Sequence, residues 1–339
     1  MTDLAAVVAK DRAEAAIAAL REEGVYDDRR QVAERDADTV LLPVTVPPTE
    51  TPVREVREAD LPTRDRGLDS RLRERGWTDA EIESAPASWA VVGSVVLVDV
   101  EGVSRPEELG AALLDLHGEA DTVLARGGIA GETRDPHVEV LAGEGDTETV
   151  HTEHGTQYAL DLAETMFSPG NAAERAGMAD VVSPDERVFD MFAGIGYFTL
   201  PMARAGAAVT AAEVDPEAYR YLVENAVLND VTGRVEAIRA DCRDVETTAD
   251  RVVMGYYPDA GGADDDAAGF LDTAIDALVP GGVVHYHEST PEAELWDRPV
   301  ERIEAAADRA GRSVAVEDRR RVKSYSAGVA HVVVDARID

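Results

Sequence analysis

The sequence predicts an α/β fold in which a doubly wound, mostly parallel sheet follows smaller α+β segments. From about residue 163 onward, short apolar stretches alternate with helical ones, which is typical of parallel strands joined by crossover helices. The stretch VFDMFAGIGYFTL, residues 188–200, combines a buried strand, a glycine-rich turn and the start of a helix. Such a turn before a helix N-terminus is typical of a nucleotide site.

The composition indicates a folded, strongly acidic protein of two or three domains. Its 339 residues include 68 Asp and Glu against 33 Lys and Arg, a net charge of −35. Lysine occurs only at Lys10 and Lys323. Dense carboxylates and scarce lysine suit molar salt, where the Debye length is about 3 Å, so we expect a halophilic organism. Because such salt screens charge, the acidity counts only weakly against RNA as a partner.

No targeting or membrane segment is expected. The charged amino-terminal stretch is unlike a signal peptide. The longest apolar run, WAVVGSVVLV at 89–98, is too short to span a bilayer and is β-branched, so we expect a buried strand there. The single cysteine, Cys242, excludes a disulfide framework and a cysteine-based zinc site. We expect a cytoplasmic protein and a monomer.

Three smaller segments are expected before the parallel sheet. Residues 1–46 are predicted to form a small domain, with a helix over 5–24 and a strand over 38–46. A Pro-rich linker and one short helix, over 68–85, occupy 47–86. Residues 87–162 are predicted to form an α+β module with polar turns before its last strand. Its strands are expected at 88–100, 121–127, 137–143 and 156–162, and its helix is expected at 106–118.

Residues 163–339 are predicted to form the ligand-binding domain. Its strands are expected at 187–192, 208–214, 235–240, 251–257, 282–288, 313–325 and 328–338. Its helices are expected to begin near Gly196, Pro216, Asp264 and Pro291. The last two strands are long and are expected to pair antiparallel, as the final strands of the sheet.

Three successive strand ends carry the candidate ligand-binding residues. Gly194 and Gly196 in the turn let the backbone approach a ligand closely. Glu213 ends the next strand about 20 residues later, where a carboxylate accepts hydrogen bonds from a ribose diol. Asp241 and Cys242 end the third strand, and a carboxylate and a backbone amide there suit an adenine edge. A dinucleotide and S-adenosylmethionine both fit this layout; the missing third glycine and the antiparallel finish favour S-adenosylmethionine.

Seven stretches together resemble a known family. They are FSPGNAAER, DMFAGIGYFTLP, EVDPEAYRYLVENAVLN, ADCRDV, DRVVMGYYP, GVVHYHES and VKSYSAGVAHVVVDARI. Over 87–338 the chain resembles the archaeal tRNA wybutosine-pathway aminocarboxypropyltransferases, relatives of the tRNA (guanine-37-N1)-methyltransferases. More weakly, 1–46 looks like the tRNA-contacting N-terminal domain of the methyltransferases. The resemblance implies a class-I S-adenosylmethionine-dependent methyltransferase-like fold with a Rossmann-like seven-stranded sheet.

The resemblance also implies a reaction and further site residues. The 3-amino-3-carboxypropyl group of S-adenosylmethionine would go to C7 of 4-demethylwyosine at position 37 of tRNA-Phe, in its anticodon loop. Ser168 and Arg175 would contact the methionine end of the cofactor, and Glu174 is a candidate base for the acceptor proton. FSPGNAAER is also typical of a helix start, with Ser168 as the cap and Pro169 at the first position.

The end of the fourth strand bears on which carbon is transferred. Methyltransferase relatives end this strand in an Asn-x-Pro motif that grips the base, whereas this chain has MGYYPDAGG with Gly255 in that region. Tyr256 and Tyr257 would stack on a flat tricyclic base or pack at the strand end. We therefore expect aminocarboxypropyl transfer, with release of methylthioadenosine, and keep guanine-37 methylation as the alternative. A protein that binds RNA or an adenosyl ligand without chemistry, and a dehydrogenase, rank lower.

For two other clusters of residues, the sequence allows either a binding role or a purely structural one. His285 and His287 in HYHE share one strand face, but no third ligand is apparent, so no metal is expected. The one dense basic run, RRRVK, would contact tRNA phosphates or form a solvated strand face. The residues of this run proposed to bind RNA are Arg319, Arg320, Arg321 and Lys323.

Overall fold

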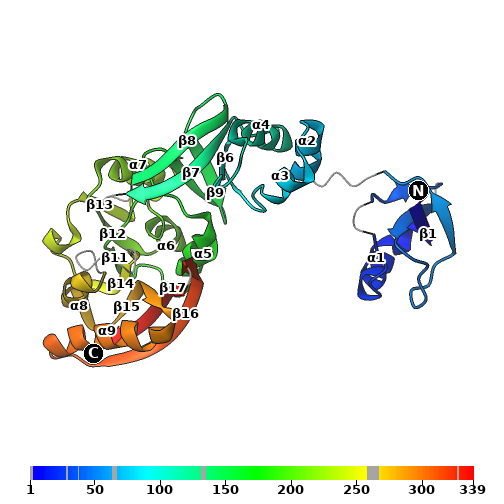
Figure 1. The fold of residues 1–339 in the computed structure, drawn as a ribbon. Coiled ribbons are helices and arrows are strands. Elements are labelled where there is room, and N and C mark those ends of the chain that lie inside the picture. The colour runs from blue at the N-terminus through cyan, green and yellow to red at the C-terminus, as the bar shows by residue number, and fades with distance from the viewer. Residues whose placement is uncertain are drawn as a thin grey trace. The chain divides into compact units, whose positions relative to one another are not determined.

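The structure is a computed structural model of the chain, and it describes residues 3–27, 30–36, 38–62, 67–130, 135–257, 267–326 and 328–339. The chain divides into two compact units, Met1–Glu83 and Ser84–Asp339, and many of their elements are labelled in Figure 1. The finer domain boundaries expected at residues 46, 86 and 162 stay predictions.

The first unit contains a four-stranded antiparallel sheet in the order β2-β3-β1-β4. Its elements are β1 (Asp3–Ala9), α1 (Ala13–Glu22), β2 (Ala33–Glu34), β3 (Thr39–Val44) and β4 (Glu55–Ala59). Helix α1 buries Leu20 in a core with Ala6 and Leu42. The helix predicted over 5–24 is therefore wrong in its first part, because Val7 and Val8 belong to a strand paired on both sides. A short apolar run fits both the helical and the strand periodicity, so pairing with other strands decides which of the two forms.

Two further expectations for this unit are corrected. The segment expected to be a linker contributes β4, which pairs with β1. The single helix expected over 68–85 is two helices, α2 (Leu68–Glu74) and α3 (Asp79–Glu83). Thr78 and Glu81 form a capping box at the start of α3: the Glu81 amide donates to the Thr78 hydroxyl at 3.3 Å, and the Thr78 amide donates to the Glu81 carboxylate at 2.8 Å.

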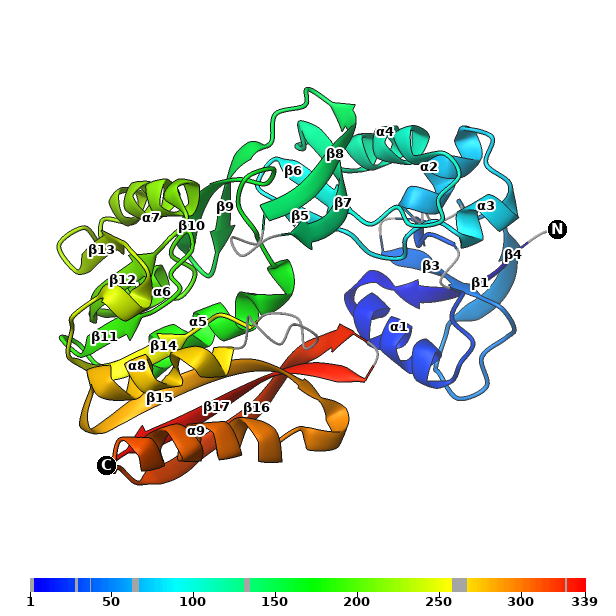
Figure 2. The same cartoon turned by 60° about the vertical axis from the view of Figure 1, so that its left-hand side comes forward.

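The second unit begins with a four-stranded sheet in the order β5-β6-β7-β8. Its elements are β5 (Ala90–Val92), β6 (Val95–Val98), α4 (Pro106–Leu116), β7 (Thr122–Ala130) and β8 (Asp135–Gly143), with α4 packed against β7 and β8 (Figure 2). The strand expected over 88–100 is instead the tight hairpin β5–β6. The stretch expected as polar turns contains β9 (Glu148–Glu153), which pairs with β10 (Thr156–Asp161).

A seven-stranded sheet follows, in the order β13-β12-β11-β14-β15-β17-β16. Its strands are β11 (Arg187–Asp190), β12 (Ala208–Glu213), β13 (Val235–Arg239), β14 (Ala249–Met254), β15 (Leu278–Pro291), β16 (Val314–Ser326) and β17 (Val329–Ile338). Strands β11 to β15 pair in parallel, whereas β17 is antiparallel to β15 and to β16. The predicted fold class, including the antiparallel finish, is confirmed.

Helices on both faces of this sheet form two hydrophobic cores. Helices α5 (Ala172–Val181), α6 (Thr199–Ala205) and α7 (Pro216–Leu228) contribute to one core, and α8 (Leu271–Ala277) and α9 (Asp297–Arg309) contribute to the other (Figure 2). Because strand side chains alternate between faces, Val188 packs in the first core and Phe189 in the second. Helix α7 begins at Pro216 as predicted, whereas α6 and α9 begin a few residues later than expected. The helix start expected near Asp264 lies outside the described residues.

Candidate active site at the carboxyl ends of the parallel strands

A cavity of about 310 Å³ lies at the carboxyl ends of strands β11 to β14, and we call it the strand-end cavity. In its wall the structure brings together five of the predicted residues, which are Gly194, Glu213, Asp241, Cys242 and Tyr256. They come from four different strand ends. This edge is where open α/β sheets bind their ligands.

The glycine-rich turn after β11 brings the backbone up to the cavity. Gly194 has a φ of +56°, and a Cβ atom there would collide with the ring of Tyr197. Gly196 lies outside the described cavity lining, and a Cβ atom on it would lie 2.8 Å from Cγ of Leu200. Gly194 therefore shapes the cavity wall, whereas Gly196 shapes the core beneath it.

Glu213 at the end of β12 is held in place by two backbone amides. The Gly194 amide donates to Oε2 at 2.7 Å, and the Asp215 amide donates to Oε1 at 2.8 Å. Burial raises the pKa of the Glu213 carboxyl, although both amide bonds oppose that rise. Each carboxylate oxygen can accept a second hydrogen bond, so a ribose diol can bind beside the amides.

Asp241 caps the short 3-10 turn that follows β13. Its Oδ1 accepts from the amide and from Nε of Arg243, both at 2.9 Å. These bonds from Arg243 lower the pKa of Asp241, so it is a carboxylate near neutral pH. Burial raises the pKa of the neighbouring Cys242 thiol to about 12, which leaves that thiol unreactive. The backbone at Cys242, rather than its sulfur, is the group suited to an adenine edge.

Sequence reasoning missed Phe192 and Phe270, which form an aromatic wall of this cavity together with Tyr256. The Phe192 ring stacks on Tyr256 with centroids 5.1 Å apart and meets Phe270 edge-on at 5.0 Å. The Arg243 guanidinium lies 4.7 Å from the centroid of the Phe270 ring. Phe192 could have been found from its place between the strand and the glycine turn. Phe270 follows an alanine- and aspartate-rich stretch that gives no such signal.

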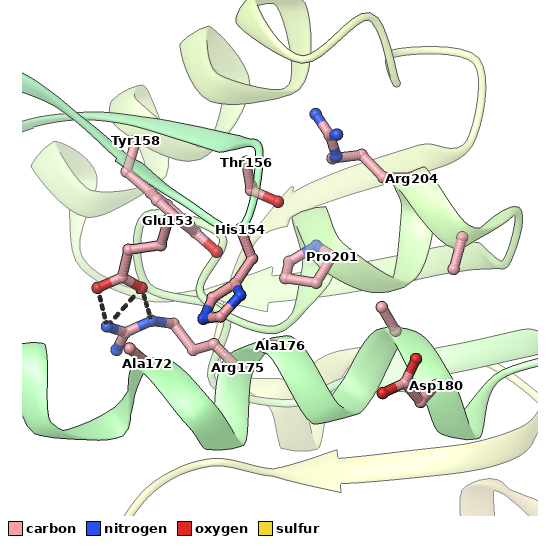
Figure 3. Close-up of a pocket in the computed structure, with 12 residues that line it drawn as sticks. Glu153, His154, Thr156, Tyr158, Ala172, Arg175, Ala176, Asp180, Pro201 and Arg204 are labelled. Carbon is pink, nitrogen blue, oxygen red and sulfur yellow. Dashed lines mark hydrogen bonds and ion pairs between the residues drawn. The ribbon is translucent and has the colours of Figure 1, made fainter. Parts of the chain in front are cut away.

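Arg175 does not belong to the described lining of the strand-end cavity. It makes a two-point ion pair with Glu153, with Nε to Oε2 and Nη2 to Oε1 both at 2.8 Å, and its side chain is only 3% exposed. Figure 3 shows this pair at a separate pocket of about 400 Å³ beside α5 and α6. The expected contact of Arg175 with the methionine end stays a prediction that this placement does not support, because Glu153 already neutralises the guanidinium.

Glu174 is also held away from the strand-end cavity. Oε2 of Glu174 accepts from Nε of Arg320 at 2.9 Å, and Nη1 of the same arginine contacts Asp335 at 2.6 Å. The Glu174 carboxylate and the Arg320 guanidinium are thus engaged with each other. The roles expected for Glu174 as a base and for Arg320 as a phosphate ligand stay predictions without support from these contacts.

The two adjacent tyrosines have different environments. Tyr256 lines the strand-end cavity, whereas Tyr257 is 4% exposed and stacks on His331 with centroids 3.7 Å apart. The Tyr257 hydroxyl accepts a hydrogen bond from Nδ2 of Asn171 at 2.7 Å. Base stacking thus fits Tyr256 better than Tyr257.

The remaining members of the basic run differ in their surroundings. Arg319 is exposed, and Arg321 pairs with Glu292 at 2.7 Å. Nζ of Lys323 donates to Oγ of Ser168 at 2.7 Å. Their contacts with tRNA phosphates stay predictions.

The histidines of HYHE have protein partners. His285 bonds Asp335 at 2.6 Å, and Nδ1 of His287 lies 3.1 Å from Nε2 of His331. Over the part of the chain that the structure describes, no group of three or more His, Cys, Asp or Glu is arranged to hold a metal. Every helix in the described ranges is too short or too polar to cross a membrane.

Two family models match the chain. The TYW2 N-terminal domain matches residues 68–147, and the TRM5/TYW2 methyltransferase domain matches 149–316, which contains the strand-end cavity. The tRNA(Phe) (4-demethylwyosine(37)-C(7)) aminocarboxypropyltransferase of Pyrococcus horikoshii is 38% identical over 286 residues, covering 81% of this chain and 99% of that protein. The chain belongs to the TRM5/TYW2 family. The resemblance found in the sequence motifs is thereby confirmed.

Other TRM5/TYW2 proteins are also similar. The protein of the same name from Methanocaldococcus jannaschii is 44% identical over 215 residues, which cover 62% of this chain and 83% of that protein. The crystal structure of P. horikoshii TYW2 in complex with MeSAdo has a TM-score of 0.68 at 34% identity, over 80% of this chain and 97% of that one. Trm5b from Pyrococcus abyssi has a TM-score of 0.78 at 32% identity, over 100% of both chains.

Proposed function

We propose that this protein transfers the 3-amino-3-carboxypropyl group of S-adenosylmethionine to C7 of 4-demethylwyosine at position 37 of tRNA-Phe. The ring carbon attacks the γ-carbon of the methionine arm, the bond from that carbon to sulfur breaks, and the electron pair stays on sulfur in methylthioadenosine. C7 then loses its proton. The sulfonium is already a good leaving group, so the task of the protein is to orient the two reactants.

The observation that carries this choice is the packing at Gly255. This residue follows β14 directly and lines the strand-end cavity. A Cβ atom on it would lie 2.7 Å from Cε2 of Phe198, a buried side chain. The region in which methyltransferase relatives carry a base-gripping Asn therefore has no room for a side chain here. The names of the two relatives at 38% and 44% identity support the same choice.

The residues of the strand-end cavity fit S-adenosylmethionine. Glu213 would accept from the ribose diol, and Asp241 with the Cys242 amide would meet the adenine. Carboxylates dominate the charged part of this lining, which suits a ligand carrying a sulfonium charge. The stacked pair of Phe192 and Tyr256 offers a flat face to the tricyclic base.

The test is to identify the small-molecule product. The protein is incubated at high salt with S-adenosylmethionine and tRNA-Phe that carries 4-demethylwyosine, with tRNA bearing guanosine at position 37 as the matched control. Methylthioadenosine from the wyosine tRNA alone is the expected result. S-adenosylhomocysteine would refute aminocarboxypropyl transfer.

The second candidate is tRNA (guanine-37-N1)-methylation. The match to P. abyssi Trm5b over the whole of both chains favours it, since that match includes the amino-terminal unit. Formation of S-adenosylhomocysteine from the guanosine-37 control tRNA would establish this alternative.

We further propose the setting in which the enzyme works. A net charge of −35 with two lysines supports a high-salt cytoplasm of a halophilic archaeon. The acceptor base supports the anticodon loop of tRNA-Phe as the RNA partner, bound by a monomer. Exposed Arg319 and the cavity residue Tyr256 are the described RNA-binding candidates whose positions best suit that role.

A further inference from the structure

Two stretches that are far apart in the chain meet in the wall of the strand-end cavity. The first, residues 164–171, leads into α5, and we call it the pre-α5 loop; residues 164–166 line the cavity. The second, residues 255–257, follows β14, and we call it the β14 end; Gly255 and Tyr256 line the cavity. Group transfer needs the cofactor and the acceptor base in one fixed relative position, so these parts of the wall must not move independently.

A buried hydrogen bond joins the pre-α5 loop to the β14 end. Nδ2 of Asn171, the last residue of the loop, donates to the Tyr257 hydroxyl at 2.7 Å, although the two residues are 86 positions apart in the sequence. Asn171 is 8% exposed and Tyr257 is 4% exposed. Because water has little access at this burial, the bond is costly to lose, and it holds the two stretches together.

The ring of Tyr257 is supported by strands inside the sheet. It stacks on the His331 ring with centroids 3.7 Å apart and an interplanar angle of 17°. Nε2 of His331 lies 3.1 Å from Nδ1 of the fully buried His287. His331 belongs to β17 and His287 to β15, and each of these strands has a neighbouring strand on both sides. The Tyr257 hydroxyl is therefore presented to Asn171 from a firmly held part of the sheet.

The pre-α5 loop is also tied to the glycine-rich turn, on the side of the cavity expected to hold the cofactor. The Tyr197 hydroxyl donates to the Met166 carbonyl, and Tyr197 lines the cavity. Nη1 of Arg175 donates to the Ser168 carbonyl at 3.0 Å, and Nζ of Lys323 donates to the Ser168 hydroxyl at 2.7 Å. The loop thus runs from the turn expected to hold the cofactor to the strand end expected to hold the acceptor.

We propose that Asn171 and Tyr257 are positioning residues for the group transfer, because their hydrogen bond keeps the pre-α5 loop and Tyr256 in one relative geometry. This inference rests on the proposed function, in which the acceptor carbon must face one carbon of the cofactor. Neither side chain contacts the reacting atoms: Tyr257 acts through the adjacent Tyr256, and Asn171 acts through the loop that precedes it. Tyr257, which is too buried to stack on a base, thereby has a role other than the one expected from the sequence.

Kinetics of two single variants and their double variant test this, at high salt with S-adenosylmethionine and tRNA-Phe that carries 4-demethylwyosine. Tyr257→Phe removes only the hydroxyl and keeps the ring on His331, and Asn171→Ala removes its partner. Each is expected to lower kcat by about 10- to 100-fold, the effect of misplacing the reactants by up to about 1 Å. The KM for tRNA and the calorimetric Kd for S-adenosylmethionine are expected to stay within about threefold. The double variant is expected to be no slower than the slower single variant, because both changes break the same bond.

Tyr221→Phe is the matched control. Tyr221 is a fully buried residue of α7, outside the described lining of the strand-end cavity, and its hydroxyl also bonds a side chain, Oε1 of Glu148 at 2.9 Å. Thermal unfolding establishes that each variant is folded. Tyr221→Phe is expected to keep the kcat of wild type, which separates a positioning effect from the loss of a buried hydrogen bond as such.

Two results would overturn the positioning role. One is a kcat within about threefold of wild type in folded Tyr257→Phe, whether or not KM rises. The other is a double variant whose loss equals the product of the two single losses, which would show that the residues act independently. The proposed function fails separately, through S-adenosylhomocysteine formed by the wild-type protein, whereas the positioning role is decided by the ratios of variant to wild-type rates for whichever product forms.

Discussion

Replacing Glu213 with alanine tests the assignment of the strand-end cavity to the cofactor. The change removes the carboxylate that accepts from the Gly194 and Asp215 amides at 2.7 and 2.8 Å. A hydrogen bond to a charged group contributes about 1.5–3 kcal/mol. Loss of the ribose acceptor, together with release of the turn that Gly194 shapes, should therefore weaken S-adenosylmethionine binding by about 100-fold or more.

The assay is calorimetric titration with S-adenosylmethionine, alongside thermal unfolding to establish that the variant is folded. Glu217→Ala is the matched control, because Glu217 lies nearby at the start of α7 and only pairs with exposed Arg220. Turnover should be lost in Glu213→Ala while tRNA affinity is kept, which separates an enzyme from a protein that only binds RNA. A folded Glu213→Ala variant that binds S-adenosylmethionine within about threefold of wild type would refute the assignment.

Two further predictions concern buried charge. Burial, then the charges of Arg320 and His285, lower the pKa of His287 to about 3, so only the unfolded chain takes up this proton between about pH 6.5 and 3. Stability linked to His287 is thus lost as the pH falls. Between pH 7 and 5 the free energy of unfolding of wild type, measured in urea, should fall by about 2 kcal/mol more than that of His287→Asn. Parallel curves of unfolding free energy against pH for the two proteins would contradict this. Arg175→Met should cost about 3 kcal/mol by removing the guanidinium partner of the largely buried Glu153 carboxylate, and Glu153→Gln in addition should restore much of it. Weaker S-adenosylmethionine binding by folded Arg175→Met would instead return Arg175 to the cofactor site.

Local pattern predicted the parallel part of the fold and five of the residues that line the strand-end cavity. Glu213 and Asp241 could be placed because each ends a strand, and parallel strands present their carboxyl ends at one edge. The prediction of a helix in place of the amino-terminal strand β1 is wrong. A short run of alanine and valine fits a helix or a strand, and only its pairing with β3 and β4 makes it a strand. Phe270 lines the cavity, although no hydrophobic periodicity in the sequence around it indicates this.

By itself, the sequence determined the order of the strands in the seven-stranded domain, the family, and the acidic groups at the strand ends, because these depend on neighbours along the chain. Only the tertiary structure decided which side chains the cations contact. Glu153 lies 22 residues from Arg175, Glu174 lies 146 residues from Arg320, and Ser168 lies 155 residues from Lys323. The physical reason is that charge pairing depends on distance in space, and the placement of β16 at the sheet edge beyond β17 brings Arg320 to Glu174 and Lys323 to Ser168.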